Sequence, residues 1–185
     1  MALVDISIRR ARPSDLRRIA AVEDAGVALF EQHLGAAVLA SVPALSAGAT
    51  SGAERDGVGT LLVAVDDRRL VGFAHVVPHD LHAHLEQVSV LPAYGRRGIG
   101  ARLVREAMEE ARWAGYGVMS LCTYRDVPWN GPFYAALGFT EVSDLEPFQR
   151  DLRAHEQALG LDDAGVRVVM QATLSRPTRR PVSDH

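Results

Sequence analysis

The stretch that decides the fold of this chain of 185 residues is Val90-Leu-Pro-Ala-Tyr-Gly-Arg-Arg-Gly-Ile-Gly-Ala-Arg-Leu103. An apolar segment over 85–90 precedes it and predicts a β-strand. The residues after the glycines repeat with helical spacing, which predicts a helix over 98–114. The apolar face of that helix consists of Ile99, Leu103, Val104, Ala107, Met108 and Ala111. A strand, a tight basic loop and a helix therefore follow one another.

Such a loop suits an anion. The first N–H groups of a helix have no partner inside the helix, and the positive end of its dipole lies there. Gly98 and Gly100 allow close approach to the backbone, and Arg96 and Arg97 add charge. A dinucleotide fingerprint is excluded because Leu103 occupies the third glycine position, and no Gly-Lys-Ser/Thr triplet of a P-loop occurs. The loop predicts a phosphate or pyrophosphate site of another kind, and a plain strand-to-helix turn is the alternative.

The loop resembles the coenzyme A-binding motif of the GNAT superfamily of acyl-CoA-dependent N-acyltransferases. In that motif a strand ending Val-x-Pro is followed by Gln or Arg, two residues, Gly, one residue, and Gly or Ala. Val90-Leu91-Pro92 matches the strand end, and Gly98 and Gly100 take the small-residue positions. The first position departs from the motif because it holds Gly95, which leaves Arg96 and Arg97 as candidates for that contact.

A second segment, Val127-Pro-Trp-Asn-Gly-Pro-Phe-Tyr-Ala-Ala-Leu-Gly-Phe139, is similar to another GNAT pattern. That pattern has an Asn, a short helix with an aromatic–Tyr pair, and Gly-Phe. The resemblance implies that Tyr134 protonates the departing thiolate and that Asn130 holds the pantetheine or phosphate arm. The alternatives are a core tyrosine and a helix cap. The expected cofactor-binding set is Val88, Ser89, Val90, Gly95, Arg96, Arg97, Gly98, Ile99, Gly100, Ala101, Asn130 and Phe133.

A base is also expected, because a free alkylamine is mostly protonated at pH 7 and only the neutral form attacks. Strand alternation predicts that His84, Glu86, Val88 and Val90 share one face. The resemblance implies a base carboxylate or histidine at His84 or Glu86. We expect Glu86 first and His84 second, and the alternative is a solvated pair at a strand edge.

Composition excludes several other classes. The formal net charge is −3, with basic runs only in the glycine loop and the tail, so we expect no nucleic-acid partner. No apolar stretch is long enough to cross a bilayer, and the first five residues are not a secretory signal. The single cysteine, Cys122, suits a cytoplasmic protein without disulfides. The spacing of His79, His82 and His84 matches no standard zinc pattern, so no metal is expected.

The order of predicted elements is β-α-α-β-β-β-α-β-α-β-α-β, an α/β fold with a central mixed sheet flanked by helices. Strands are expected over 6–10, 61–65, 70–77, 85–90, 118–123, 139–142 and 167–174, helices over 14–30, 36–45, 98–114, 132–137 and 145–159, and a mobile loop over 46–59. The strand–helix–strand unit over 85–123 predicts parallel pairing. The order is similar to the GNAT fold over residues 5–175, which implies one domain over 1–175 and a disordered tail over 176–185.

The resemblance implies direct transfer of an acetyl group from acetyl-CoA to a primary amine of a small molecule in a ternary complex. The thioester is expected between the strands at 88–90 and 118–123, which can splay, with its carbonyl polarised by the amide of Val88. Glu23, Asp24 and Glu31 are candidates for the acceptor site. Two alternatives stay open: a protein or peptide N-acetyltransferase, and a non-catalytic acyl-CoA-binding or sensing domain. A homodimer is a further expectation.

Overall fold

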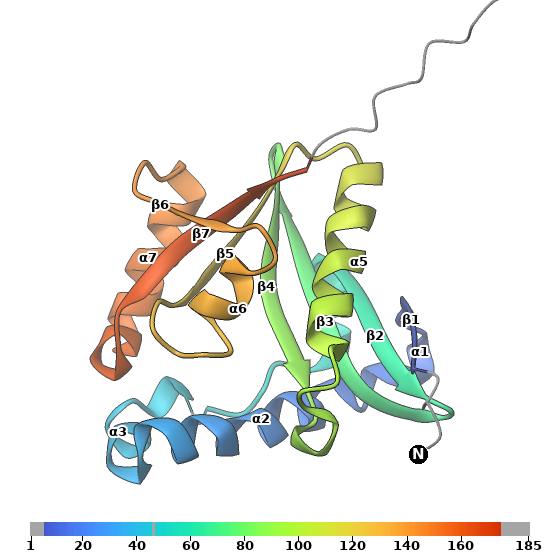
Figure 1. The fold of residues 1–185 in the computed structure, drawn as a ribbon, viewed down its shortest axis with the longest axis horizontal. Helices are drawn as coiled ribbons and strands as arrows, with labels where there is room; N and C mark the ends of the chain where they lie inside the picture. Colours follow the sequence, from blue (N-terminus) through green and yellow to red (C-terminus); the bar gives the residue numbers. More distant parts are fainter. Residues whose placement is uncertain (1–5, 46, 175–185) are drawn as a thin grey trace, which may run out of the picture.

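The computed structural model describes residues 6–45 and 47–174, and these build one mixed sheet with helices on both faces (Figure 1). The described strands follow the order β1-β2-β3-β4-β5-β7-β6 across the sheet. They are β1 (Ile6–Arg10), β2 (Thr60–Asp66), β3 (Arg69–His79), β4 (His82–Val90), β5 (Val118–Tyr124), β6 (Thr140–Val142) and β7 (Arg167–Thr173). The helices are α1 (Pro13–Leu16), α2 (Ile19–Leu34), α3 (Ala36–Ser41), α4 (Gly52–Val58), α5 (Ile99–Trp113), α6 (Gly131–Ala135) and α7 (Pro147–Ala158).

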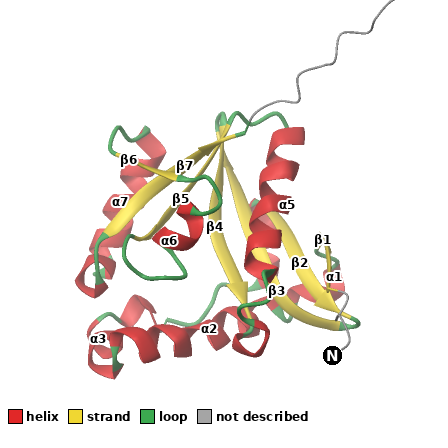
Figure 2. Cartoon of the chain, in the orientation of Figure 1, coloured by secondary structure: helices red, strands yellow, loops and turns green. Residues whose placement is uncertain are grey.

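The two faces of the sheet carry separate cores, as alternation along β2 shows. Leu62 and Ala64 belong to the cluster that packs against α5. Leu61 and Val63 point the other way and pack with Ile19 of α2. Figure 2 shows α5 and α2 in red, lying against different parts of the yellow sheet. The predicted apolar face of α5 is confirmed, because five of its six residues are buried and Met108 packs against the same cluster.

The contact between β4 and β5 is short. They are parallel, as the strand–helix–strand pattern predicts, but their ladder pairs only His82–His84 with Val118–Ser120. Every other neighbouring pair of described strands is antiparallel. Beyond Ser120 the two strands diverge, which opens the sheet toward the end crossed by α2 (Figure 1). The predicted splay is therefore present, and it leaves backbone of β4 over 88–90 unpaired on the β5 side.

The expected loop over 46–59 is partly wrong, because it contains helix α4. The side chain of Ser51 accepts a hydrogen bond from the N–H of Glu54, and the Glu54 carboxylate accepts one from the N–H of Ser51. This is a capping box. Gly52 allows the helix to dock, since a Cβ there would lie 2.8 Å from Cα of Leu16. The high Gly, Ala and Ser content of the segment favoured a loop, so this short helix was not predicted.

Other boundaries also differ, and the expected helix over 36–45 ends at Ser41, followed by a 3-10 turn over Pro43–Leu45. The expected helix over 14–30 is divided into α1 and α2, and α2 continues to Leu34. The β4 strand begins at His82, three residues earlier than expected, because β3 and β4 form a hairpin that turns at Asp80 with φ of 49°. The expected tail over 176–185 lies outside the described residues. Among the residues that are described, no helix is long and apolar enough to cross a membrane.

Candidate functional site

The glycine loop places a free helix N-terminus beside the open edge of β4. Gly98 is the N-cap of α5 and adopts a left-handed φ of 74°, a conformation that favours glycine. The N–H of Arg102 donates to the carbonyl of Gly98, at 3.0 Å, as the first helical hydrogen bond. The N–H groups of Ile99, Gly100 and Ala101 therefore have no acceptor within the helix, and no side chain caps them. This is the arrangement expected of an anion site.

Arg96 and Arg97 of the loop differ in how far contacts within the protein hold their side chains. The guanidinium of Arg97 lies over the ring of Tyr94, 5.0 Å from its centroid, and donates to the carbonyl of Ala93. Arg96 is exposed and has a left-handed φ of 59°. At Gly95 a Cβ would lie 3.1 Å from the carbonyl oxygen of Pro92, so this turn favours glycine at the position where the motif has Gln or Arg. Arg96 is therefore the less constrained of the two candidates for the missing contact.

The two sequence motifs meet in space. A Cβ on Gly100 would be in van der Waals contact with Cζ of Phe133, at 3.5 Å, and with Cγ2 of Val90, at 3.9 Å. The ring of Phe133 in turn contacts the ring of Tyr134, with centroids 5.0 Å apart. The first turn of α5, the end of β4 and helix α6 therefore line one place.

Tyr134 lies on the α5 face with 9% of its surface exposed. Burial raises the pKa of its phenol above the ordinary value, so the group is protonated at pH 7 and available as a proton donor. Asn130 occupies the N-cap position of α6, but its side chain makes no capping bond. Its backbone carbonyl accepts the first hydrogen bond of the helix, from the N–H of Tyr134 at 2.9 Å. The Asn130 amide thus keeps its capacity for a ligand.

The predicted common face of the four β4 residues is wrong. His75 of β3 pairs with Gln87 and Val76 pairs with Leu85, so Glu86 is an extra residue in β4. Such a bulge reverses the alternation of side chains beyond it. His84 and Glu86 lie on the α2 face, whereas Val88 and Val90 pack with the α5 cluster. Alternation in the sequence gave no sign of the bulge, because the inserted residue is itself polar.

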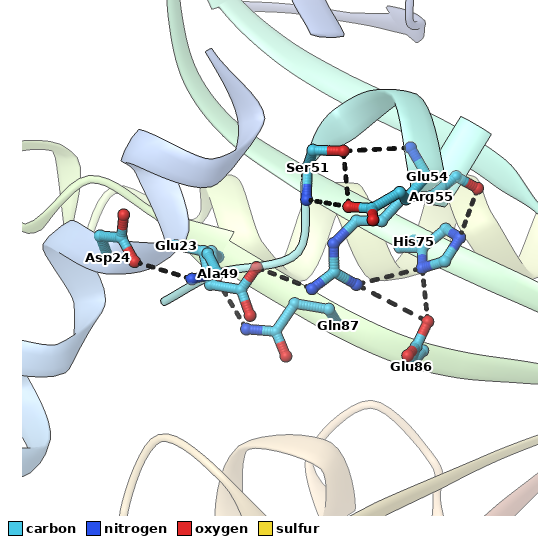
Figure 3. A network of polar contacts seen from close by, with 10 residues as sticks. Glu23, Asp24, Ala49, Ser51, Glu54, Arg55, His75, Glu86 and Gln87 are labelled. Carbon is cyan, nitrogen blue, oxygen red and sulfur yellow. Dashed lines mark hydrogen bonds and ion pairs between the residues drawn. The ribbon is translucent and has the colours of Figure 1, made fainter. Parts of the chain in front are cut away.

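Glu86 belongs to a network of charged groups from four elements (Figure 3). Its Oε2 lies 2.6 Å from Nδ1 of His75 and 3.6 Å from Nη1 of Arg55. Arg55 of α4 also pairs with Glu23 of α2, with Nη2 2.7 Å from Oε2. The hydrogen bond from His75 holds the pKa of Glu86 below its ordinary value, against the opposing effect of burial. The carboxylate is therefore ionised at pH 7, and about half of the side chain is exposed.

The sequence did not indicate the roles of Arg55 and His75. From the sequence, His75 in its apolar strand either faces the substrate cleft or is a core residue, and the core interpretation is favoured; Arg55 falls in the segment expected to be a loop. The capping box of Ser51 and Glu54 was the one available signal, because it predicts a helix that would carry Arg55 inward.

His84 is a weaker candidate for the base than Glu86. It is 4% exposed, and its Nδ1 lies 3.0 Å from Oγ of Ser120. Burial and the charge of His79 lower the pKa of His84 to about 4, so the ring is neutral at pH 7. The ring of Phe148 on α7 packs against it, with centroids 6.1 Å apart.

A separate open groove of about 580 Å³ lies between α2 and the β2–β3 turn. It is lined by Arg18, Ala21, Val22, Asp66, Asp67, Arg68, Arg69, Leu70 and Leu91. None of the predicted catalytic or cofactor-binding residues lines it. The candidate site is instead the edge of β4 that β5 leaves unpaired, with Tyr134 on the α5 face of the sheet and Glu86 on the α2 face.

Known proteins share this fold. Residues 57–141, from the end of α4 into β6, match the family model described as an acetyltransferase (GNAT) domain. The structure of PaiA N-acetyltransferase from Thermoplasma acidophilum in complex with coenzyme A is similar over 91% of this chain and 99% of its own, with a TM-score of 0.66 and 18% identity. The family model thus matches the part of the chain that holds the glycine loop, α5 and α6, and the structural likeness extends over the whole fold. The predicted mixed-sheet GNAT fold is confirmed.

Other acetyltransferases resemble it in part. A GNAT family acetyltransferase from Brucella melitensis, in complex with acetyl-CoA, is 26% identical over 75% of this chain and 84% of its own, with a TM-score of 0.53. The mycothiol acetyltransferase of Nocardia farcinica is 34% identical over 97 residues, which are 52% of this chain and 31% of that protein. That of Rhodococcus jostii is 40% identical over 84 residues, 45% of this chain and 27% of that protein. The chain thus aligns with about a third of the length of these two mycothiol acetyltransferases, or less.

Proposed function

We propose that this chain is an N-acetyltransferase that moves an acetyl group from acetyl-CoA to a primary amine. The observation that carries the proposal is the opening between β4 and β5. The glycine loop and Tyr134 flank it on the α5 face, and Glu86 flanks it on the α2 face. A thioester in the opening would be reached by an acid from one side and by an acceptor amine with its base from the other.

Several features support acetyl-CoA as the co-substrate. The free N–H groups over 99–101 suit the pyrophosphate, and Arg96 adds a positive charge. The unpaired edge of β4 over 88–90 suits the pantetheine arm, which would pair as an added strand. Gly100 leaves room beside Phe133, and the side-chain amide of Asn130 is available. The similar structures from T. acidophilum and B. melitensis are complexes with coenzyme A and with acetyl-CoA.

The chemistry then follows from the residues present. Glu86 removes one proton from the acceptor ammonium, and the neutral nitrogen forms a bond to the acetyl carbon as the C–S bond breaks. The second proton that the nitrogen loses replaces the one that Tyr134 gives to the sulfur. The amide of Val88 polarises the carbonyl oxygen, and Tyr134 donates its proton to the departing thiolate sulfur. Burial raises the pKa of Cys122 to about 12, so this thiol is not a nucleophile at pH 7. That supports direct transfer in a ternary complex.

A small molecule is the acceptor that we propose. The matched relatives are named mycothiol acetyltransferases, but they align with this chain over a minor part of their length. Glu23, partly exposed beside Arg55, would face such an acceptor. A protein or peptide acceptor would show itself as acetylation of a peptide library in preference to small amines. A cytoplasmic homodimer is also proposed, and sedimentation as a single species of 20.0 kDa would exclude the dimer.

The experiment is an acetylation screen of small amines and peptides, with thiol release measured for the parent, Glu86→Gln and Tyr134→Phe. General acid–base groups contribute roughly 10²- to 10⁴-fold, so each substitution is expected to lower kcat within that range while acetyl-CoA still binds. Asp56→Asn, which changes an exposed carboxylate on α4, is the matched control. Acetyl-CoA binding without turnover of any amine would favour the non-catalytic binding domain instead.

A further inference from the structure

His75 sits where it could receive a proton from Glu86, and its surroundings fit both of its protonation states. Its Nε2 lies 3.0 Å from the carbonyl oxygen of Arg55, which can only accept a hydrogen bond, so Nε2 carries a proton in either state. Its Nδ1 lies 2.6 Å from Oε2 of Glu86 and 3.2 Å from Nη1 of Arg55. One ring nitrogen therefore faces both an acceptor and a donor.

Each state of Nδ1 has its own partner. When Nδ1 is protonated, it donates to the Glu86 carboxylate in a charge-assisted hydrogen bond. When Nδ1 has lost its proton, the guanidinium of Arg55 donates to the exposed lone pair. Arg55 is itself held by Glu23 and is 5% exposed, so its guanidinium stays in place during the exchange.

The backbone makes room for this arrangement. His75 is 1% exposed in the middle of β3, and a Cβ on Gly59 would lie 2.8 Å from its Nε2. Helix α4 ends directly before Gly59, so the same turn supplies the carbonyl and the side chain of Arg55. Arg55 thus contacts both ring nitrogens of His75, with its carbonyl oxygen at Nε2 and its guanidinium at Nδ1.

We propose that His75 is a positioning residue that receives the amine proton through Glu86, and that Arg55 stabilises it after the proton has left. This inference rests on the proposed acetyl transfer. An N–H bond of the acceptor ammonium breaks as an O–H bond forms at Glu86. That O–H bond breaks in turn as an N–H bond forms at Nδ1 of His75, which until then is unprotonated and accepts from Nη1 of Arg55. After the product leaves, the proton returns through the half-exposed Glu86 to water.

Other charged groups face this pair and set its response to pH. They are Arg55 from α4, Glu23 from α2 and His84 from β4. Asp24 lies behind Glu23, and His79 lies behind His84. None of these supplies a second ring nitrogen against the Glu86 carboxylate, so a substitution at His75 isolates its effect.

The first test is the pH profile of kcat/KM for the parent and His75→Gln. We expect kcat at pH 7 to fall roughly tenfold to a hundredfold in His75→Gln. We also expect the acidic limb of the kcat/KM profile to move to lower pH, because the amine proton then ends on Glu86 and not on His75. Asp56→Asn on the same helix is the control and leaves the limb in place. A fall in kcat with an acidic limb that stays in place, or that moves to higher pH because Glu86 has lost the hydrogen bond that lowers its pKa, would mean that His75 is only structural, and the proposal would be overturned.

The second test needs no acceptor, so it separates this proposal from the proposed function. The ring nitrogens of His75 are followed by ¹⁵N NMR across pH in the protein without ligands. The titration midpoint moves to lower pH in Glu86→Gln, which loses the acceptor, and to higher pH in Arg55→Met, which loses the donor. Midpoints that stay unchanged, or move in the same direction, would overturn the proposal. If Arg55→Met does not fold, the proposal is judged on the change of the His75 midpoint in Glu86→Gln alone.

Discussion

Gly131, at the first turn of α6, offers a sharp test of how the candidate acid is held. A Cβ on this residue would lie 2.9 Å from the carbonyl carbon of Arg125 and closer still to its oxygen. Those atoms are backbone and cannot turn aside, so Gly131→Ala must displace either the 125–130 loop or α6. Helix α6 carries both Phe133 and Tyr134, so the displacement moves the proposed acid.

The magnitude follows from the overlap. Overpacking of this kind costs about 1–3 kcal/mol. For a domain of this size, 1 kcal/mol corresponds to roughly 2–4 °C in Tm, so Gly131→Ala should melt about 2–12 °C below the parent. Gly117→Ala is the matched control, because a Cβ there meets nothing within 4 Å and the residue has no left-handed φ. It should be unchanged or more stable by about 0.4–1 kcal/mol.

The assay is thermal and urea unfolding, followed by acetyl-CoA binding and turnover. Gly131→Ala should lose turnover more than affinity for acetyl-CoA, because Tyr134 lies on the displaced helix α6, whereas the free N–H groups of the glycine loop lie on α5. An unchanged Tm for Gly131→Ala would refute the tight packing described for α6. An equal loss in Gly117→Ala would show that any glycine replacement harms this chain.

Two further predictions concern stability. Leu103→Ala empties a fully buried position beneath α5 and should cost about 2.7–5 kcal/mol in urea unfolding; a loss below 1 kcal/mol would mean that the α5 core is not packed as described. The pKa of His84 is lowered to about 4 from 6.5, so the unfolded chain binds this proton at a higher pH than the folded protein does. The contribution of His84 to the free energy of unfolding is therefore fully present above pH 6.5. It falls by about 3 kcal/mol as the pH decreases toward 4. Urea unfolding of the parent and His84→Gln at pH 7 and pH 4 checks this, and an equal pH dependence in both proteins would contradict it.

Much of the fold was predictable from the sequence because its signals are local. The apolar period of 99–111 specified α5 and its buried face, and the strand before it required a parallel crossover to β5. The glycine loop could be placed at the helix entrance for the same reason. These features depend on neighbours in sequence, and tertiary packing did not override them.

The acceptor side of the site was harder to predict, because it depends on contacts between distant elements. The bulge at Glu86 is visible only in the pairing of β3 with β4, and it changed which β4 residues share a face. Arg55 reaches His75 across 20 positions of sequence and Glu23 across 32. No period or motif encodes such a network, and a short helix within a Gly- and Ala-rich stretch brings it together.

The most direct measurement is a calorimetric titration with acetyl-CoA of the parent and of the variant in which Arg96 and Arg97 are both changed to Ala. Micromolar binding by the parent is expected, weakened roughly tenfold or more in the variant, since a hydrogen bond to a charged group contributes about 1.5–3 kcal/mol. Arg105→Ala, which removes an exposed arginine from α5, is the control and should bind like the parent. Absence of binding to acetyl-CoA, or equal binding by all three proteins, would contradict the placement of the cofactor at the glycine loop.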